Sequence, residues 1–248
     1  MNIIPTVTIP PQSHSSLSTF FTCARQFEAR YILKTLPYEE TVATAWGNAA
    51  HKAAEDFINS NGRQQFPDQR HPENGKSLRD YQWCVEAVMN RAAQRGGQIV
   101  VERSMAVTRD KQPTDFWDKA AWIRGKIDVT ILYPERGEAE ILDWKTNAKK
   151  KTDPAQVQLY CAATFADYAW VEKAKCGFVF LNFPDAFERP TVFPRFHAPA
   201  LWRIFEDKYA QLKDAYQSGV FPPKPSGLCN GWCPLQSCEF WKPKKEKR

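Results

Sequence analysis

The sequence predicts an α/β fold in which a central mixed β-sheet is flanked by helices. Three observations lead to this expectation. Apolar residues recur at helical spacing in several segments of the first 95 positions. Short β-rich runs then follow one another between residues 98 and 144. Helical and strand patterns alternate after residue 153, and this order is typical of a sheet covered by helices on both faces.

The helices and strands are expected at the following positions. The first helix is capped by Ser16 or Ser18 and ends near Leu33, and Asp153-Pro154 is a strong start for a later helix because an N-cap is followed by proline. The polar segment 60–77 is expected to form a loop, and 134–138 (PERGE) a hairpin turn. The remaining helices are expected over residues 45–59, 78–95, 153–172 and 202–218, and the strands over 98–108, 122–133, 138–144 and 176–183.

Composition places the chain among ordinary globular proteins. With 248 residues it fits one domain, which we expect over residues 16–241, between an extended lead-in (1–15) and a basic tail (242–248). The net charge of +6 suits a polyanionic partner without requiring one. No apolar run is long enough to span a bilayer, and the N-terminus lacks the pattern of a secretion signal. We therefore expect a cytoplasmic protein with no membrane contact.

Two acidic residues and a lysine stand out in the predicted sheet. Asp128 lies in the middle of an apolar strand and Asp143 near the end of the next one. A buried carboxylate is costly unless it is compensated, and a divalent cation compensates two converging carboxylates. Lys145 shares a strand face with Asp143, where an ammonium can orient water or neutralise a phosphate. These groups suit phosphodiester hydrolysis at a metal ion, although Asp-x-Lys alone is common and also occurs on solvated hairpins.

Asp128, Asp143 and Lys145 belong to a series of four short motifs that follow one another in a definite order. They are Gly-x-x-x-His (Gly47, His51), Gly-x-x-Asp (Gly125, Asp128), Asp-x-Lys-Thr (Asp143, Lys145, Thr146) and Gln-x-x-x-Tyr (Gln156, Tyr160). Each motif is loose by itself. In this order and at these separations, the chain resembles the RecB-like branch of the PD-(D/E)XK nuclease superfamily from residue 16 to residue 238.

The resemblance implies a bound Mg²⁺ or Mn²⁺ ion. Its ligands would be His51, Asp128, Asp143 and the backbone carbonyl of Trp144. Lys145 would activate or orient the attacking water. Without the order of the motifs, a histidine on a helix is more often an ordinary packed or surface residue.

The resemblance also implies roles on the helices. Gln156 and Tyr160 lie one turn apart on one helix face and would contact DNA or position Lys145. Tyr160 alone would also be consistent with core packing. Glu55 follows His51 by one turn, where it is either an outer ligand or a solvated residue.

The implied activity is that of a metal-dependent deoxyribonuclease, more specifically an exonuclease acting on DNA ends or single strands in recombination, repair, or phage or CRISPR DNA processing. The chain has no Walker-type phosphate loop and therefore no visible motor of its own, and the partners considered are a helicase, a recombinase or an integrase. The alternative is a non-catalytic DNA-binding or scaffolding module with the same fold. Residues 149–151 (KKK) either contact phosphate or are solvated, and Trp46, Trp117 and Trp122 either stack on bases or pack in the core.

The cysteines fall into two groups. The first group consists of Cys23, near the start of the chain, and Cys229, Cys233 and Cys238, near its end. The last three lie within ten positions in an irregular stretch, which is typical of metal ligands. Four thiolates can hold zinc or an iron–sulfur cluster. The resemblance to CRISPR-associated and AddAB-type exonucleases implies a [4Fe–4S] cluster that forms a cysteine-rich staple over residues 226–241, with Zn²⁺ as the alternative. The other cysteines are expected to be buried: Cys84, Cys161 and Cys176.

Overall fold

The computed structural model describes residues 8–244 and divides them into two compact units. The core unit is Glu40–Phe205, and the terminal unit combines residues 8–39 with residues 206–244. The first part of the predicted lead-in and the last part of the predicted basic tail lie outside the described residues. Within the described part of the chain, no helix is both long and apolar enough to cross a membrane.

The core unit contains a five-stranded mixed sheet in the order β1-β2-β3-β4-β5. Strands β1, β2 and β3 pair antiparallel, β4 runs parallel to β3, and β5 is antiparallel to β4. The predicted mixed sheet flanked by helices is confirmed. The strands are β1 (Gln98–Val107), β2 (Ile123–Tyr133), β3 (Glu138–Lys145), β4 (Lys173–Phe180) and β5 (Thr191–Pro194), the last of which the sequence did not predict.

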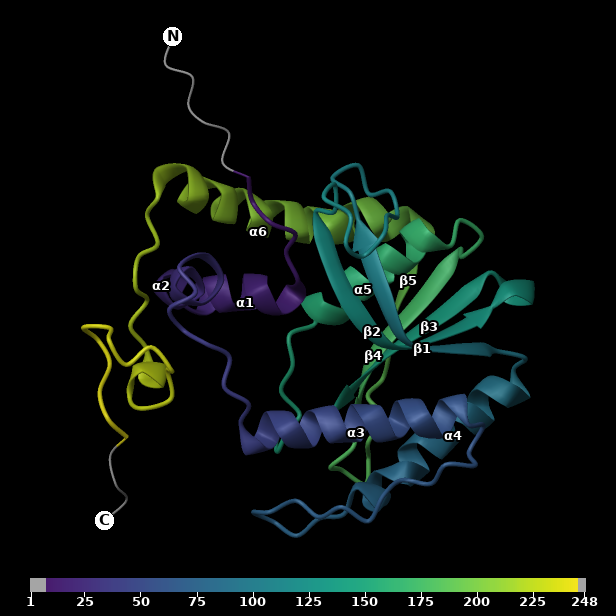
Figure 1. Ribbon diagram of the computed structural model, residues 1–248. Helices are drawn as coiled ribbons and strands as arrows, with labels where there is room; N and C mark the ends of the chain where they lie inside the picture. The colour runs from purple at the N-terminus through teal and green to yellow at the C-terminus, as the bar shows by residue number, and fades with distance from the viewer. Residues whose placement is uncertain (1–7, 245–248) are drawn as a thin grey trace. The chain divides into compact units, whose positions relative to one another are not determined.

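Helices cover both faces of this sheet (Figure 1). On one face, α3 (Val42–Asn59) and α4 (Gln82–Gln94, after the 3-10 turn Leu78–Tyr81) enclose the main apolar core together with side chains of β2 and β3. On the other face, α5 (Ala155–Asp167) packs against β1, β3 and β4. The predicted helix from residue 153 ends at Asp167 because Tyr168 has an extended backbone.

The hairpin between β2 and β3 sets the register of the acidic residues. The predicted turn is a short 3-10 helix, Pro134–Arg136, followed by Gly137 in the left-handed conformation (φ 59°). The ladder pairs Val129 with Leu142, and extending it by one step places Asp128 beside Asp143. The register of β1 against β2 likewise places Glu102 opposite Asp128. Three carboxylates therefore lie in a row across three neighbouring strands.

Strand β1 changes the face to which its side chains point at Glu102. Val101 packs against the core of α3 and α4, whereas Arg103 hydrogen-bonds Thr164 of α5 on the opposite face. In a regular strand, residues 101 and 103 would share a face. Glu102 has a φ of +47°, and this left-handed backbone interrupts the alternation.

The terminal unit is helical at its beginning and irregular at its end. The single helix predicted up to Leu33 is divided into α1 (His14–Thr22), α2 (Ala24–Phe27) and a π-helix (Glu28–Ile32), because Cys23 has an extended backbone. Phe27 packs its ring against Tyr216 and Phe221 from the other end of the chain. The 3-10 turn Gly227–Cys229 also belongs to this unit, whereas the 3-10 turn Arg195–His197 belongs to the core unit. The last helix, α6 (Ala198–Ser218), begins four residues before its predicted start and is divided between the two units.

Candidate active site

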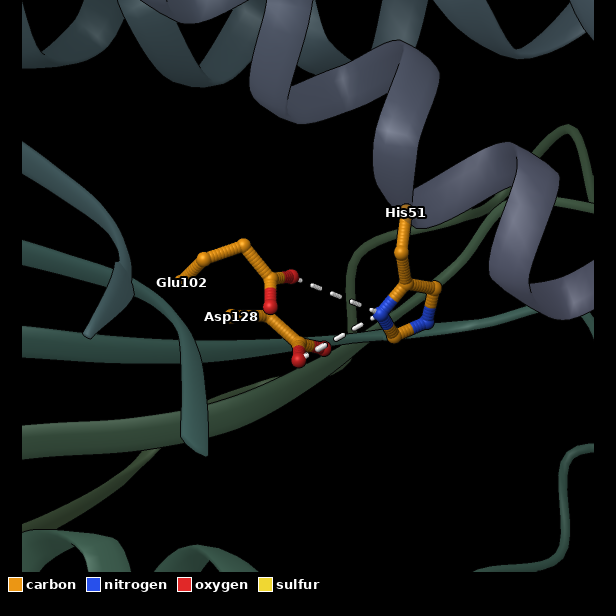
Figure 2. Close-up of side chains that lie close together, drawn as sticks. All are labelled: His51, Glu102 and Asp128. Atoms are coloured by element: carbon orange, nitrogen blue, oxygen red, sulfur yellow. Dashed lines mark ion pairs between the residues drawn. The ribbon is translucent and has the colours of Figure 1, made fainter. Parts of the chain in front are cut away.

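Three side chains from separate elements converge at the centre of the core unit. His51 comes from α3, Glu102 from β1 and Asp128 from β2, and one ligand atom of each lies within 4.8 Å of the others (Figure 2). The Nδ1 atom of His51 is 3.4 Å from Asp128 Oδ1 and 3.9 Å from Glu102 Oε1. Figure 2 shows both carboxylates pointing toward the same ring nitrogen.

The backbone of β3 fixes two of these side chains. The other ring nitrogen of His51, Nε2, is 3.1 Å from the carbonyl oxygen of Trp144, and it must be the donor because a carbonyl only accepts. The amide of Trp144 donates to Asp128 Oδ2 over 2.8 Å. This leaves Nδ1 as the nitrogen that faces the carboxylates. A backbone carbonyl that orients the second ring nitrogen is the usual support of a histidine metal ligand.

The acidic surroundings hold a proton on His51 when the site has no cation. Burial by itself lowers the pKa of His51, but the hydrogen bond and charge of Asp128, with the charges of Asp143 and Glu102, outweigh it and raise the pKa to about 9. A cation that binds here must therefore displace this proton. Metal binding at the site is expected to strengthen as the pH rises.

Asp143 and Lys145 of β3 are joined to α5 by one glutamine. Lys145 Nζ is 2.5 Å from Asp143 Oδ2 and donates to Gln156 Oε1 over 2.9 Å. The amide nitrogen of Gln156 donates to Asp143 Oδ1 over 2.7 Å and lies 3.3 Å from the hydroxyl of Tyr160. A Cβ atom on Gly125 would be 3.6 Å from the ring of Tyr160. This is an ordinary contact distance, so the ring of Tyr160 lies directly beside β2.

Asp143 is buried beside other negative charge. Burial, followed by the charge of Asp128, raises its pKa to about 7, although Lys145 acts in the opposite direction. Its Oδ2 atom accepts no hydrogen bond of good geometry from any described residue. Among the described residues, Oδ2 is therefore paired only with the ammonium of Lys145, 2.5 Å away, and a cation bound nearby would add to this compensation.

Comparison with known proteins assigns the family. A model of the PD-(D/E)XK nuclease superfamily matches residues 11–239. The chain belongs to the PD-(D/E)XK nuclease superfamily. Among solved structures it is similar to a protein from Eubacterium rectale described as a "putative exonuclease" (14% identity, 90% of this chain and 87% of that chain covered, TM-score 0.48) and to the protein SSO0001 (13% identity, 94% and 88% covered, TM-score 0.40). No curated protein matches the chain.

The residues at the centre of this PD-(D/E)XK protein fit a divalent cation. One imidazole and several carboxylate oxygens form a donor set that suits Mg²⁺ or Mn²⁺. His51, Glu102 and Asp128 already lie within range of one another, and the carboxylate of Asp143 is near enough for its charge to act on His51. The Trp144 carbonyl, also predicted to be a ligand, accepts a hydrogen bond from His51 Nε2 here, and its role as a ligand stays a prediction.

The sequence pointed to Glu55 as a possible outer ligand and missed Glu102. Glu55 pairs with Lys52 on its own helix, at 3.1 Å, in agreement with the solvated alternative. Glu102 could not be recognised as a ligand because it follows an apolar run in a predicted strand that has no motif around it. The only available signal was a lone acid at a position that pairs with Asp128, and this becomes visible only when the register of β1 is known.

A second group of predicted ligands lies in the terminal unit. Cys23, Cys229, Cys233 and Cys238 all line one cavity, together with Trp241 and other side chains. The backbone amide of Ser226 donates to the sulfur of Cys229 over 3.4 Å. Among the described residues, no three of these four sulfur atoms lie within 4.8 Å of one another. All seven cysteines are free, and the three outside this group are buried as predicted.

Proposed function

We propose that this protein is a metal-dependent DNA exonuclease of the RecB-like branch. The four motifs in their order support the branch, and one observation carries the catalytic part. Three carboxylates, a histidine and a lysine from α3, β1, β2 and β3 meet at one place, where the ammonium of Lys145 is the only partner that the described residues supply to the buried Oδ2 of Asp143. A divalent cation bound there supplies the charge that polarises a phosphoryl group and lowers the pKa of the attacking water.

The proposed roles follow from the contacts. His51, Glu102, Asp128 and Asp143 hold the cation. Lys145 orients the attacking water or neutralises the phosphate, because its ammonium lies beside Asp143 and is held by Gln156. Tyr160 supports Gln156 from the next turn of α5.

We further propose that the cysteine cavity holds a [4Fe–4S] cluster. This proposal is supported by the resemblance and by the single cavity that all four cysteines line. In a [4Fe–4S] cluster each of the four cysteines would bind a different iron atom. A colourless protein containing stoichiometric zinc after anaerobic purification would favour the alternative.

A time course on DNA labelled at one end tests the proposed activity. With Mg²⁺ or Mn²⁺, purified protein should shorten single-stranded DNA from an end, and a chelator should stop the reaction. Binding of DNA without cleavage in any divalent metal would instead favour the non-catalytic DNA-binding module. If internal fragments appear early and the strand is not shortened successively from its end, the protein is an endonuclease rather than an exonuclease.

A further inference from the structure

The loop that joins β1 to β2 presents one large aromatic side chain to solvent. Trp117 is 79% exposed, whereas Trp46 and Trp122, the other tryptophans considered for base stacking, are each 5% exposed and belong to the core. Exposing an indole to water is unfavourable. An ordered, exposed tryptophan near a site is therefore a candidate contact for a partner.

Its neighbours hold this indole in position. The guanidinium carbon of Arg124 lies 4.9 Å from the ring centroid of Trp117 and 5.3 Å from that of Phe116. Arg124 also donates to the carbonyl of Phe116 over 3.4 Å, and the two aromatic rings meet edge to face at 5.0 Å. Asp118 closes the loop by accepting the amide of Ala120 over 2.8 Å. Because the ring is already ordered, less conformational entropy is lost when a ligand stacks on it.

A row of positive charge connects this indole with the candidate active site. Arg124 and Lys126 are two residues apart on β2 and so share a face. Lys126 Nζ is 3.4 Å from Glu102 Oε2, and Glu102 belongs to the acidic group. Arg124 is four residues from Asp128, which is about 13 Å along an extended strand. A polyanion entering a site lined with carboxylates requires such positive charge beside it.

We propose that Trp117, Arg124 and Lys126 bind the unpaired DNA segment next to the scissile phosphate. Trp117 stacks on one base, and Arg124 and Lys126 contact phosphates. Alternation of basic and stacking aromatic side chains is how proteins hold single strands, whereas a duplex keeps its base faces covered. This proposal rests on the proposed nuclease function and specifies its substrate as a strand with unpaired bases.

Fluorescence anisotropy with dye-labelled oligo(dT), in EDTA to prevent cleavage, tests the surface. Trp117→Ala should weaken binding by about tenfold, and Trp117→Phe should retain most of the affinity. In Lys126→Ala the slope of log affinity against log salt concentration should become shallower by roughly 1, which corresponds to the loss of one phosphate contact. The matched control is Trp83→Ala, because Trp83 is also exposed (43%) but lies on α4. Blunt duplex DNA should bind Trp117→Ala and the wild type equally.

Two results would overturn the proposal. The first is single-strand affinity in Trp117→Ala equal to that of Trp83→Ala, with both variants melting like the wild type. The second is an equal loss for blunt duplex, which would assign the contact to the backbone alone. Cleavage in Mn²⁺ is measured in parallel. If the wild type cleaves DNA and Trp117→Ala has the same KM, the proposed DNA-binding surface is refuted but the nuclease function is not. Wild-type protein that binds through Trp117 but never cleaves refutes the nuclease function and leaves the surface standing.

Discussion

Asp143 is the residue at which burial, charge and hydrogen bonding conflict most strongly. Its Oδ1 accepts from Gln156, but its Oδ2 has only the nearby charge of Lys145. Local rules of strand alternation and helical spacing predicted two pairs, Asp143 with Lys145 and Gln156 with Tyr160. That the second pair would either position Lys145 or contact DNA was implied by the resemblance. The sequence could not predict which oxygen would lack a hydrogen bond, because that depends on contacts between β3 and α5.

Removing the lysine charge should impair chemistry more than metal binding. In Lys145→Met we expect the single-turnover cleavage rate to fall by about 100-fold or more, as for loss of a group that assists proton transfer or stabilises charge. Mn²⁺ affinity, measured by calorimetry, should change much less. Lys52→Met is the control, because Lys52 pairs with Glu55 and Asp56 on the surface of the same helix as His51. Equal cleavage rates in both variants would remove Lys145 from the mechanism.

The metal-free protein should become less stable as the pH rises from about 4 to 7. The pKa of Asp143 is raised to about 7 in the folded state, so the folded protein binds more protons than the unfolded chain in this range. The raised pKa of His51 acts in the same direction, because its stabilising proton is lost as the pH rises toward 9. Urea titrations in EDTA should show unfolding free energy falling by on the order of 2 to 4 kcal/mol. Asp143→Asn should flatten this dependence, and an unchanged slope would contradict the assignment.

At the scale of elements, the main unpredicted feature is the change of face in β1. The hairpin of β2 and β3 could be predicted because its strands are apolar and its turn contains Gly137. The left-handed backbone conformation of Glu102 could not be predicted, because in a sequence only glycine, asparagine and aspartate indicate that conformation. The helix break at Cys23 could not be predicted either, because neither proline nor glycine occurs there.

The strained position of Glu102 is expected to serve the metal site. Strained backbone tends to occur at functional sites, where the surrounding fold maintains it. Glu102→Gln should weaken Mn²⁺ binding by about tenfold or more, within the range seen for lost metal-site interactions. Glu55→Gln is the matched control, because Glu55 pairs with Lys52 outside the site. Calorimetry that gives both variants the wild-type affinity would exclude Glu102 as a ligand.

At the scale of the whole molecule, the candidate active site belongs entirely to the core unit, and the cysteine cavity belongs entirely to the terminal unit. The sequence predicted the grouping of distant cysteines from their spacing and from the resemblance. The short strand β5 was not predicted because it has only four residues and ends in Pro194, although Thr191, Val192 and Phe193 are residue types that favour strands.

The two groups of cysteines should differ in their response to substitution. Cys233→Ser should abolish broad visible absorption after anaerobic purification and lower the melting temperature by about 5 °C or more, because a metal centre that binds only the folded state stabilises it. Cys161→Ala, which alters a buried cysteine outside the cavity, should retain the colour. Visible absorption and iron content check this outcome. Full iron content in Cys233→Ser would contradict a cluster held by all four thiols.

The most direct test of the account is cleavage of end-labelled single-stranded DNA by Asp143→Ala beside the wild type, with Mg²⁺ or Mn²⁺. Asp56→Ala is the control, because Asp56 pairs with Lys52 on the surface of α3 and does not belong to the acidic group. The wild type and Asp56→Ala should degrade the strand, whereas Asp143→Ala should be inactive while retaining a folded circular dichroism spectrum. Cleavage by Asp143→Ala at the wild-type rate would contradict the assignment of this site as the nuclease centre.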